Sequence, residues 1–274
     1  MLIDPLVADW MDWLNAKAAR MAADAHIYLL LDGVFVPGLH RTLKAALPKD
    51  QELTLLFESL PGCSEEARDV SPLVMPYVAD NGGLAKVLGR CSGWPMVSAI
   101  VTPESIGELT GRLAAWCVVE VDDQHFNFRF PDTRRLPGIF NALSPDQRGE
   151  LAGPATAWYY IDRNGSWKAL LVPQSDRPAA VSPSLDATQF SAMVGDSEAD
   201  EVIMLLQDRG RQWEQAHSTI HGLVSEALQA ANESRLETDL RVDWCEACID
   251  DAANLGDEQI AERLARWRAR AAPA

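Results

Sequence analysis

The spacing of apolar and polar residues predicts two parts of the chain that meet near residue 185. In the first part, residues 27–31 are continuously apolar, which indicates a strand covered on both faces. Residues 126–130 alternate apolar and polar side chains, which indicates a half-buried strand that Pro131 ends. Residues 157–161 and 166–172 flank Asn164-Gly165, a strong signal for a β-hairpin.

Other segments of the first part alternate between strand-like and helix-like patterns. Asp4-Pro5 predicts the start of a helix whose apolar stripe continues to Met21. Expected strands span residues 52–57, 96–101 and 117–121, and residues 72–74 form another apolar run. Expected helices span about 39–47, 84–88, 102–115, 137–143 and 145–151, with a polar loop at 58–71. Strands interleaved with helices predict an α/β lobe over residues 1–180, with a mixed sheet covered by helices.

The second part has a helical period only. Residues 173–184 hold three prolines and three serines, which predicts a linker. From residue 196 to about 229, apolar side chains at helical spacing predict one long helix, and two later segments repeat the pattern. The residues that carry these stripes are Ile203, Leu206, Trp213, Ile220 and Leu223 or Val224, then Leu236, Leu240 and Trp244, then Ile260, Leu264 and Trp267. We therefore expect an all-α lobe over residues 185–274.

The charge of the chain narrows the classes of partner. The formal net charge is −16 and the sequence pI is about 4.7, whereas proteins that bind nucleic acid or anionic membranes need basic patches. The acidity is concentrated after residue 185, with 18 acidic and 8 basic residues. No run approaches the roughly 20 apolar residues of a membrane span, and the first residues lack the basic region of a signal peptide. We expect a cytoplasmic protein with no nucleic-acid or membrane partner.

Residues that could carry chemistry are present but lack the required context. The five cysteines are scattered, so they do not form a disulfide framework. Cys245 and Cys248 have the spacing of a metal or redox motif, yet no second ligand pair has suitable spacing and both fall in the middle of a predicted helix. We expect them to pack against other helices. His217 and His221 could chelate a metal, but the glutamate of a His-Glu-x-x-His motif is absent.

Motifs for phosphate binding and for a serine nucleophile are absent from the sequence. Asp122 and Asp123 are adjacent, and neighbours at a strand end point to opposite sides, so we interpret them as turn residues and not as a catalytic pair. The sequence therefore gives no support for an enzyme, and we expect no catalytic residue, cofactor or bound metal.

An acid–base cluster follows the alternating strand at residues 126–130. Asp132 can cap a helix, and we predict that it caps one beginning near Arg134. We also predict that Arg129 or Arg134 pairs with a nearby carboxylate or backbone carbonyl. The cluster contains no arrangement of side chains that is typical of catalysis, so it indicates a structural or recognition role.

The order of short motifs between residues 27 and 158 resembles the adaptor-chaperone family of bacterial type VI secretion. The family's densest motif is Phe-Arg-Phe-x-Asp-Pro-Arg-x-Leu, and residues 128–136 read Phe-Arg-Phe-Pro-Asp-Thr-Arg-Arg-Leu. The chain departs from the family pattern at Thr133, Pro131 and Arg112, where the family commonly has proline, an aromatic residue and histidine. The other motifs are residues 28–33, 56–57, 71–74, Trp94, 103–109, 112–113, Gly153-Pro154 and Trp158.

The resemblance implies a non-catalytic protein that binds one toxic effector and helps to load it onto the valine-glycine-repeat (VgrG) spike protein. It also implies an α/β lobe followed by a helical lobe. The candidate partner-binding residues are Phe128, Arg129, Asp132 and Arg134 in the motif, and Trp213, Trp244 and Trp267 in the helical lobe. We expect the helical lobe to bind the effector and the α/β lobe to engage the spike.

Three alternatives remain open at this point. The three tryptophans of the helical lobe can instead hold its helices together. The whole protein can be a binding or regulatory module outside secretion, or an enzyme of a class that its motifs do not reveal. An enzyme would require a pocket in which titratable groups converge.

Overall fold

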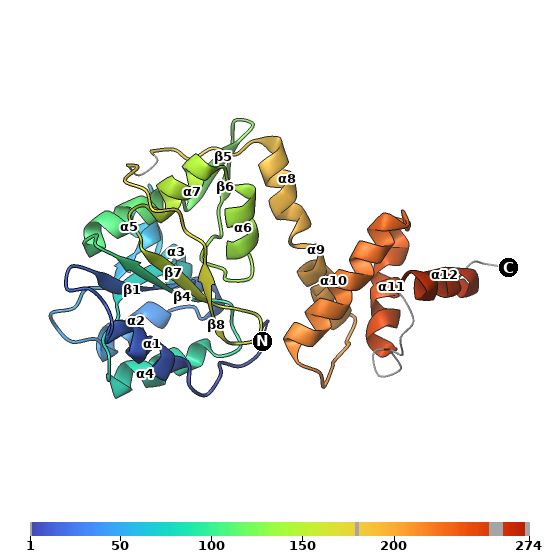
Figure 1. The fold of residues 1–274 in the computed structure, drawn as a ribbon, viewed down its shortest axis with the longest axis horizontal. Coiled ribbons are helices and arrows are strands. Elements are labelled where there is room, and N and C mark those ends of the chain that lie inside the picture. The colour runs from blue at the N-terminus through green and yellow to red at the C-terminus, as the bar shows by residue number, and fades with distance from the viewer. Residues whose placement is uncertain (1, 179–180, 252–259, 272–274) are drawn as a thin grey trace. The chain divides into compact units, whose positions relative to one another are not determined.

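A computed structural model describes residues 2–178, 181–251 and 260–271 and divides the chain into two units, Met1–Met193 and Val194–Ala274 (Figure 1). The first unit is α/β, and the described part of the second unit is helical, which confirms the expected fold class. Residues 1, 179–180, 252–259 and 272–274 of the two expected lobes lie outside the described residues. Among the described residues, none of the helices combines the length and the apolar character that a membrane span requires.

The first unit is built on a six-stranded sheet with the strand order β2-β3-β1-β4-β7-β8. Its strands are β1 (His26–Leu31), β2 (Thr54–Leu55), β3 (Leu73–Pro76), β4 (Val97–Thr102), β7 (Ala157–Ile161) and β8 (Trp167–Leu170). Every pairing in this sheet is antiparallel, so the expectation of a mixed sheet is corrected. The apolar run at β1 predicts burial on both faces, and this burial does not depend on strand direction.

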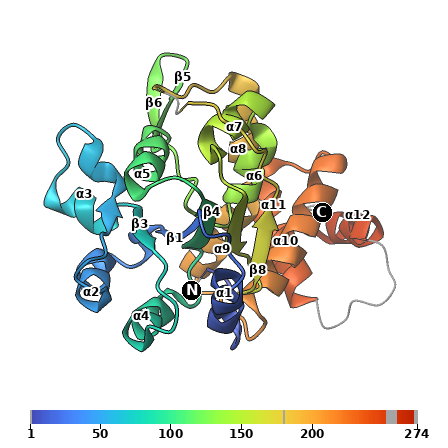
Figure 2. The ribbon, with the colours of Figure 1, turned by 60° about the vertical axis from the view of Figure 1, so that its left-hand side comes forward.

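Helices cover both faces of this sheet, which explains the continuous apolar character of β1. Tyr28 and Leu30 belong to one buried core, whereas Ile27, Leu29 and Leu31 belong to the other. Figures 1 and 2 show α1, α2 and α4 on one side of the sheet and α5, α6 and α7 on the other. The helices of this unit are α1 (Trp10–Ala18), α2 (Leu39–Ala46), α3 (Glu65–Val70), α4 (Gly82–Leu88), α5 (Ile106–Ala115), α6 (Leu136–Ala142) and α7 (Pro145–Ala152), with 3-10 turns η1 (Gly33–Phe35), η2 (Leu56–Ser59) and η3 (Gly89–Cys91). Helix α8 (Ala187–Gly195) also belongs to it, except for its last two residues.

The first helix begins at Trp10 and not at Asp4-Pro5 as predicted. The preceding segment bonds to the β7–β8 hairpin loop, where the Val7 N–H donates to the Gly165 carbonyl at 3.1 Å. Gly165 has a φ of +71°, and a Cβ there would lie 2.0 Å from the Pro5 carbonyl oxygen. The segment from Asp4 to Val7 is therefore held against the hairpin loop, and the helix starts only after it.

Two predictions for short segments of the first unit also need correction. The expected strand at residues 52–57 is reduced to the two residues of β2, which are followed by η2. The expected polar loop at residues 58–71 contains α3, whose first turn is capped when Ser64 accepts a hydrogen bond from the Ala67 N–H.

The first unit also contains a small second sheet, to which the last part of the unit bonds. Strands β5 (Val118–Val121) and β6 (Gln124–Asn127) form a hairpin, and Asp122 and Asp123 make its turn with φ of 47° and 60°, which confirms that they are turn residues.

The predicted linker at residues 173–184 runs into this small sheet. The Glu120 N–H donates to the Pro183 carbonyl and the Leu185 N–H donates to the Glu120 carbonyl, both at 2.9 Å. Leu185 is buried in the core of the first unit, and Phe190 and Met193 of α8 pack against that core. The first unit therefore extends to Met193, beyond the boundary expected near residue 180.

The second unit has its own apolar core, to which α9 (Glu198–Asp208), α10 (His217–Glu233), α11 (Thr238–Asp250) and α12 (Ile260–Ala271) contribute. The single helix predicted over residues 196–229 is wrong, because α9 ends and α10 begins within it. At the end of α9, Gly210 has a φ of +88°, and the Arg211 N–H donates to the Leu206 carbonyl at 3.0 Å. This is a Schellman helix end, which needs a left-handed residue such as glycine.

Candidate functional site

The motif segment at residues 128–136 keeps the predicted alternation but not the predicted strand. Strand β6 ends at Asn127, while burial still alternates: Phe128 and Phe130 are buried, and Asn127 and Arg129 are exposed. The Phe128 ring lies 5.8 Å from the ring of Trp116, centroid to centroid. Phe128 is therefore a core residue of the first unit, and a partner cannot reach it in this conformation.

Asp132 is a buried acceptor for Arg134 and does not cap a helix. Its carboxylate accepts the Arg134 backbone N–H at 3.1 Å and pairs with the Arg134 guanidinium at 2.8 and 3.1 Å. Helix α6 begins later, at Leu136, and its N-cap residue makes no side-chain cap. The predicted cap is wrong because Arg134 occupies the carboxylate and Pro137 places the helix start further on. The predicted pairing of Arg134 with a carboxylate is confirmed.

Arg129 joins the motif to the end of the central strand. Its guanidinium lies 2.8 Å from the carboxylate of Asp32, which follows β1, and 3.8 Å from that of Asp132. It also lies over the ring of Phe35 at 5.1 Å, and that ring stacks on Trp94 at 5.9 Å. The Arg129 side chain is 42% exposed, so this residue combines a structural ion pair with access to solvent. The predicted pairing of Arg129 is also confirmed.

Burial and charge oppose each other at Asp32. Removal from water is the main cause that raises the pKa of Asp32, and the nearby Asp132 carboxylate acts in the same direction. The charge and hydrogen bond of Arg129 act to lower the pKa, as does the backbone N–H of Val34. Two buried carboxylates thus share one guanidinium, which makes Arg129 the link between β1 and the motif segment.

Other motif residues meet at the same end of the sheet. A Cβ on Gly33 would lie 2.2 Å from the Ser71 carbonyl oxygen, so only glycine allows these two backbone segments to approach. The Ser71 hydroxyl accepts the Phe57 N–H at 3.0 Å. The Thr133 N–H donates to the Pro95 carbonyl at 2.9 Å. Motifs that are dispersed in the sequence are therefore joined by backbone contacts and by the hydroxyl of Ser71.

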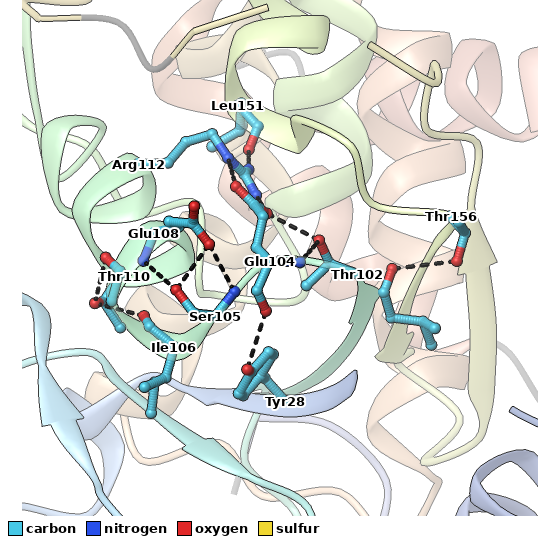
Figure 3. Close-up of polar contacts among 12 residues, drawn as sticks. Tyr28, Thr102, Glu104, Ser105, Ile106, Glu108, Thr110, Arg112, Leu151 and Thr156 are labelled. Atoms are coloured by element: carbon cyan, nitrogen blue, oxygen red, sulfur yellow. Dashed lines mark hydrogen bonds and ion pairs between the residues drawn. The ribbon is translucent and has the colours of Figure 1, made fainter. Parts of the chain in front are cut away.

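A second cluster surrounds the start of α5 (Figure 3). Ser105 and Glu108 form a capping box, so the helix starts after Ser105 and not at the predicted Thr102-Pro103. Glu104 lies outside the helix and turns its carboxylate toward Arg112, two turns along α5. The Thr102 hydroxyl donates to the same carboxylate at 2.9 Å.

Arg112 is the buried centre of this cluster, with only 3% of its side chain exposed. Its Nε lies 3.0 Å from a Glu104 oxygen, its Nη2 pairs with the other oxygen, and its Nη1 donates to the Leu151 carbonyl at the end of α7. Gly153 has a φ of +57°, and a Cβ there would lie 2.4 Å from the Arg112 Nε. The Gly153-Pro154 motif thus makes room for the guanidinium, a role that the sequence did not reveal.

A family model covers the first cluster and most of the second, but not Leu151 and Gly153. Residues 27–150 match the domain of unknown function DUF4123. Comparisons with curated proteins and with solved structures found no match. The DUF4123 region runs from β1 into α7 and includes Asp32, Glu104, Arg112 and the whole motif at residues 128–136. It ends before Gly153 and includes none of the second unit.

The three candidate tryptophans of the second unit pack against the core of that unit. Trp244 is 2% exposed, its Nε1 donates to the Ala227 carbonyl at 2.9 Å, and its ring lies 5.7 Å from that of Trp267. Trp267 and Trp213 are partly buried against the same core, and Trp213 lies between α9 and α10 and not on a helix. This arrangement agrees with the alternative that the tryptophans hold the helices together.

Cys245 and Cys248 lie in α11 and are buried in the same core. Burial is the main cause that raises the pKa of each thiol to about 12, so both are protonated at neutral pH and are poor nucleophiles. The Nδ1 of His221 lies 3.4 Å from the Ser225 hydroxyl. Among the described residues, no three His, Cys, Asp or Glu side chains are grouped as a metal site.

Proposed function

We propose that the protein is a non-catalytic adaptor of bacterial type VI secretion that binds one toxic effector in the cytoplasm and helps to load it onto the VgrG spike. The observation that carries the proposal is the DUF4123 match over residues 27–150, in which the motifs that resemble the adaptor-chaperone family occur in order. The resemblance extends beyond the match to Gly153-Pro154 and Trp158.

The ion pairs that the charged motif residues form support a binding role. Asp132 pairs with Arg134, and Glu104 pairs with Arg112, in both cases within the first unit. A catalytic centre requires titratable groups that face a substrate. Here these groups are engaged in holding loops and helix ends together, so their arrangement favours a rigid scaffold for protein contacts.

We assign the effector to the second unit and the spike to the first. From Val194 on, the chain has 17 acidic and 8 basic residues, which suits a basic effector surface and steers its approach. On the first unit, Arg129 is exposed beside Phe35 and Trp94, and Val34 is 38% exposed. Arginine and aromatic side chains are enriched at the energetic centres of protein interfaces, which makes this surface our candidate for spike contact.

Truncation after Met193 tests this assignment. The shortened chain should fold, because it retains both cores of the first unit and the bonds at residues 183–185. It should lose the effector while it still binds the spike. The measurement is co-purification of the effector and of the spike with the full chain and with residues 1–193, with circular dichroism as a control for folding. Undiminished recovery of the effector with residues 1–193 would contradict the assignment and point to the motif at residues 128–136.

A further inference from the structure

Helix α9 has an outer face that the core of the second unit does not use. Val202, Ile203 and Leu206 are buried on its inner side. Met204 and Leu205 are large apolar residues, yet they are 52% and 50% exposed. Single exposed apolar side chains are ordinary, whereas Met204 and Leu205 are two large exposed apolar residues at consecutive positions of one helix.

Acidic residues flank this pair along the helix. Glu201 lies three residues before Met204, and Asp208 lies three residues after Leu205, and both are exposed. Positions 201, 204, 205 and 208 have the spacing i, i+3, i+4 and i+7, which places them on one side of a helix. The same spacing is used by helices that bind in the groove of another protein. We call Glu201, Met204, Leu205 and Asp208 the α9 outer face.

We infer that the α9 outer face is a docking surface for a protein whose contact area has an apolar centre and a basic rim. Met204 and Leu205 would enter the apolar centre, and methionine in particular adapts its shape to a partner. Glu201 and Asp208 would meet the basic rim.

The acidic charge of the second unit distinguishes between the possible occupants of the α9 outer face. A second copy would place the acidic ends of one helix against those of another, in a unit that already has nine more acidic than basic residues. An anionic membrane would repel the same carboxylates. A partner with a basic rim is attracted by the same carboxylates that would repel a second copy or an anionic membrane. The occupant is therefore a basic protein surface. This inference rests on the proposed function, in which that partner is the effector.

Substitutions at the apolar pair test the inference with the full chain. The probe is a purified candidate toxin, chosen from the proteins that co-purify with the full chain. Met204→Asp and Leu205→Asp should each raise the Kd for the toxin at least about tenfold, because each places a carboxylate in the apolar contact. Leu171→Asp is the matched control, since Leu171 is an apolar residue of the first unit that is 92% exposed, and its Kd should not change. Circular dichroism checks that all three variants fold.

Asp208→Lys provides an independent measurement on the acidic rim. It should slow association with the toxin and reduce the dependence of the association rate on salt, because a steering charge is reversed. If the toxin binds the wild-type chain and both apolar-pair variants equally well, the inference is overturned while the proposed function stands. If the toxin does not bind the wild-type chain at all, the proposed function fails, and the inference fails with it.

Discussion

Replacement of Arg112 with alanine is expected to lower the free energy of unfolding by about 3–5 kcal/mol. The side chain is 3% exposed, and its guanidinium holds the Glu104 carboxylate and the Leu151 carbonyl together. Its loss leaves a carboxylate that is only 13% exposed without its cation and opens a space beside Gly153. Chemical denaturation of the wild-type and variant chains measures the difference.

A surface ion pair of the same unit is the matched control for this variant. Arg177 lies 2.6 Å from Asp146, but the two side chains are 48% and 66% exposed. Arg177→Ala should cost no more than about 1 kcal/mol, because solvent and salt screen an exposed pair. The double variant Arg112→Met with Glu104→Gln should be more stable than Arg112→Ala, since no charge is left unpaired. Equal losses of unfolding free energy in Arg112→Ala and Arg177→Ala would contradict the structural role of Arg112.

Replacement of Asp132 with alanine should cost a similar amount, about 3–5 kcal/mol. The carboxylate is 2% exposed and accepts the backbone N–H and the guanidinium of Arg134, whose side chain is 7% exposed. Its removal takes away the carboxylate with which this buried guanidinium pairs. Loss of a helix cap alone would cost only about 0.5–2 kcal/mol, so the size of the loss distinguishes the two roles.

Asp132→Asn separates the hydrogen bond from the charge. An asparagine keeps a carbonyl oxygen that can accept the Arg134 N–H, but it cannot balance the charge of the guanidinium. Asp132→Asn should therefore lower the stability less than Asp132→Ala does. The midpoint of thermal unfolding gives the order wild type, asparagine, alanine. An unchanged midpoint in Asp132→Ala would contradict the structural role and would indicate that Asp132 contacts a partner directly.

Local patterns were sufficient for many elements of the fold. The apolar run at β1, the Asp122-Asp123 turn and the helix start at Ser144 follow from side chains that lie next to each other in the sequence. The start of α1 and the end of α9 could not be predicted in this way. The first depends on a hairpin loop far along the chain, and the second depends on Gly210, which the helical period of the apolar residues conceals.

The candidate site shows the same limit. The sequence indicated that Arg129 pairs with a carboxylate, but Asp32 is 97 residues away, and only the fold brings the two together. Trp244 and Trp267 satisfied the pattern of binding anchors, and the same pattern is satisfied by residues that pack helices together. The exposure of Met204 and Leu205 could have been suspected, because both lie off the apolar stripe that Ile203 and Leu206 follow.

Reconstitution from three purified proteins tests the adaptor role most directly. The VgrG spike is immobilised, the effector is added with or without the full chain, and the effector retained on the spike is measured. The proposed function predicts that retention requires the full chain and that the amount retained saturates as the chain is added. Equal retention of the effector with and without the chain, or no retention in either case, would contradict the proposed function.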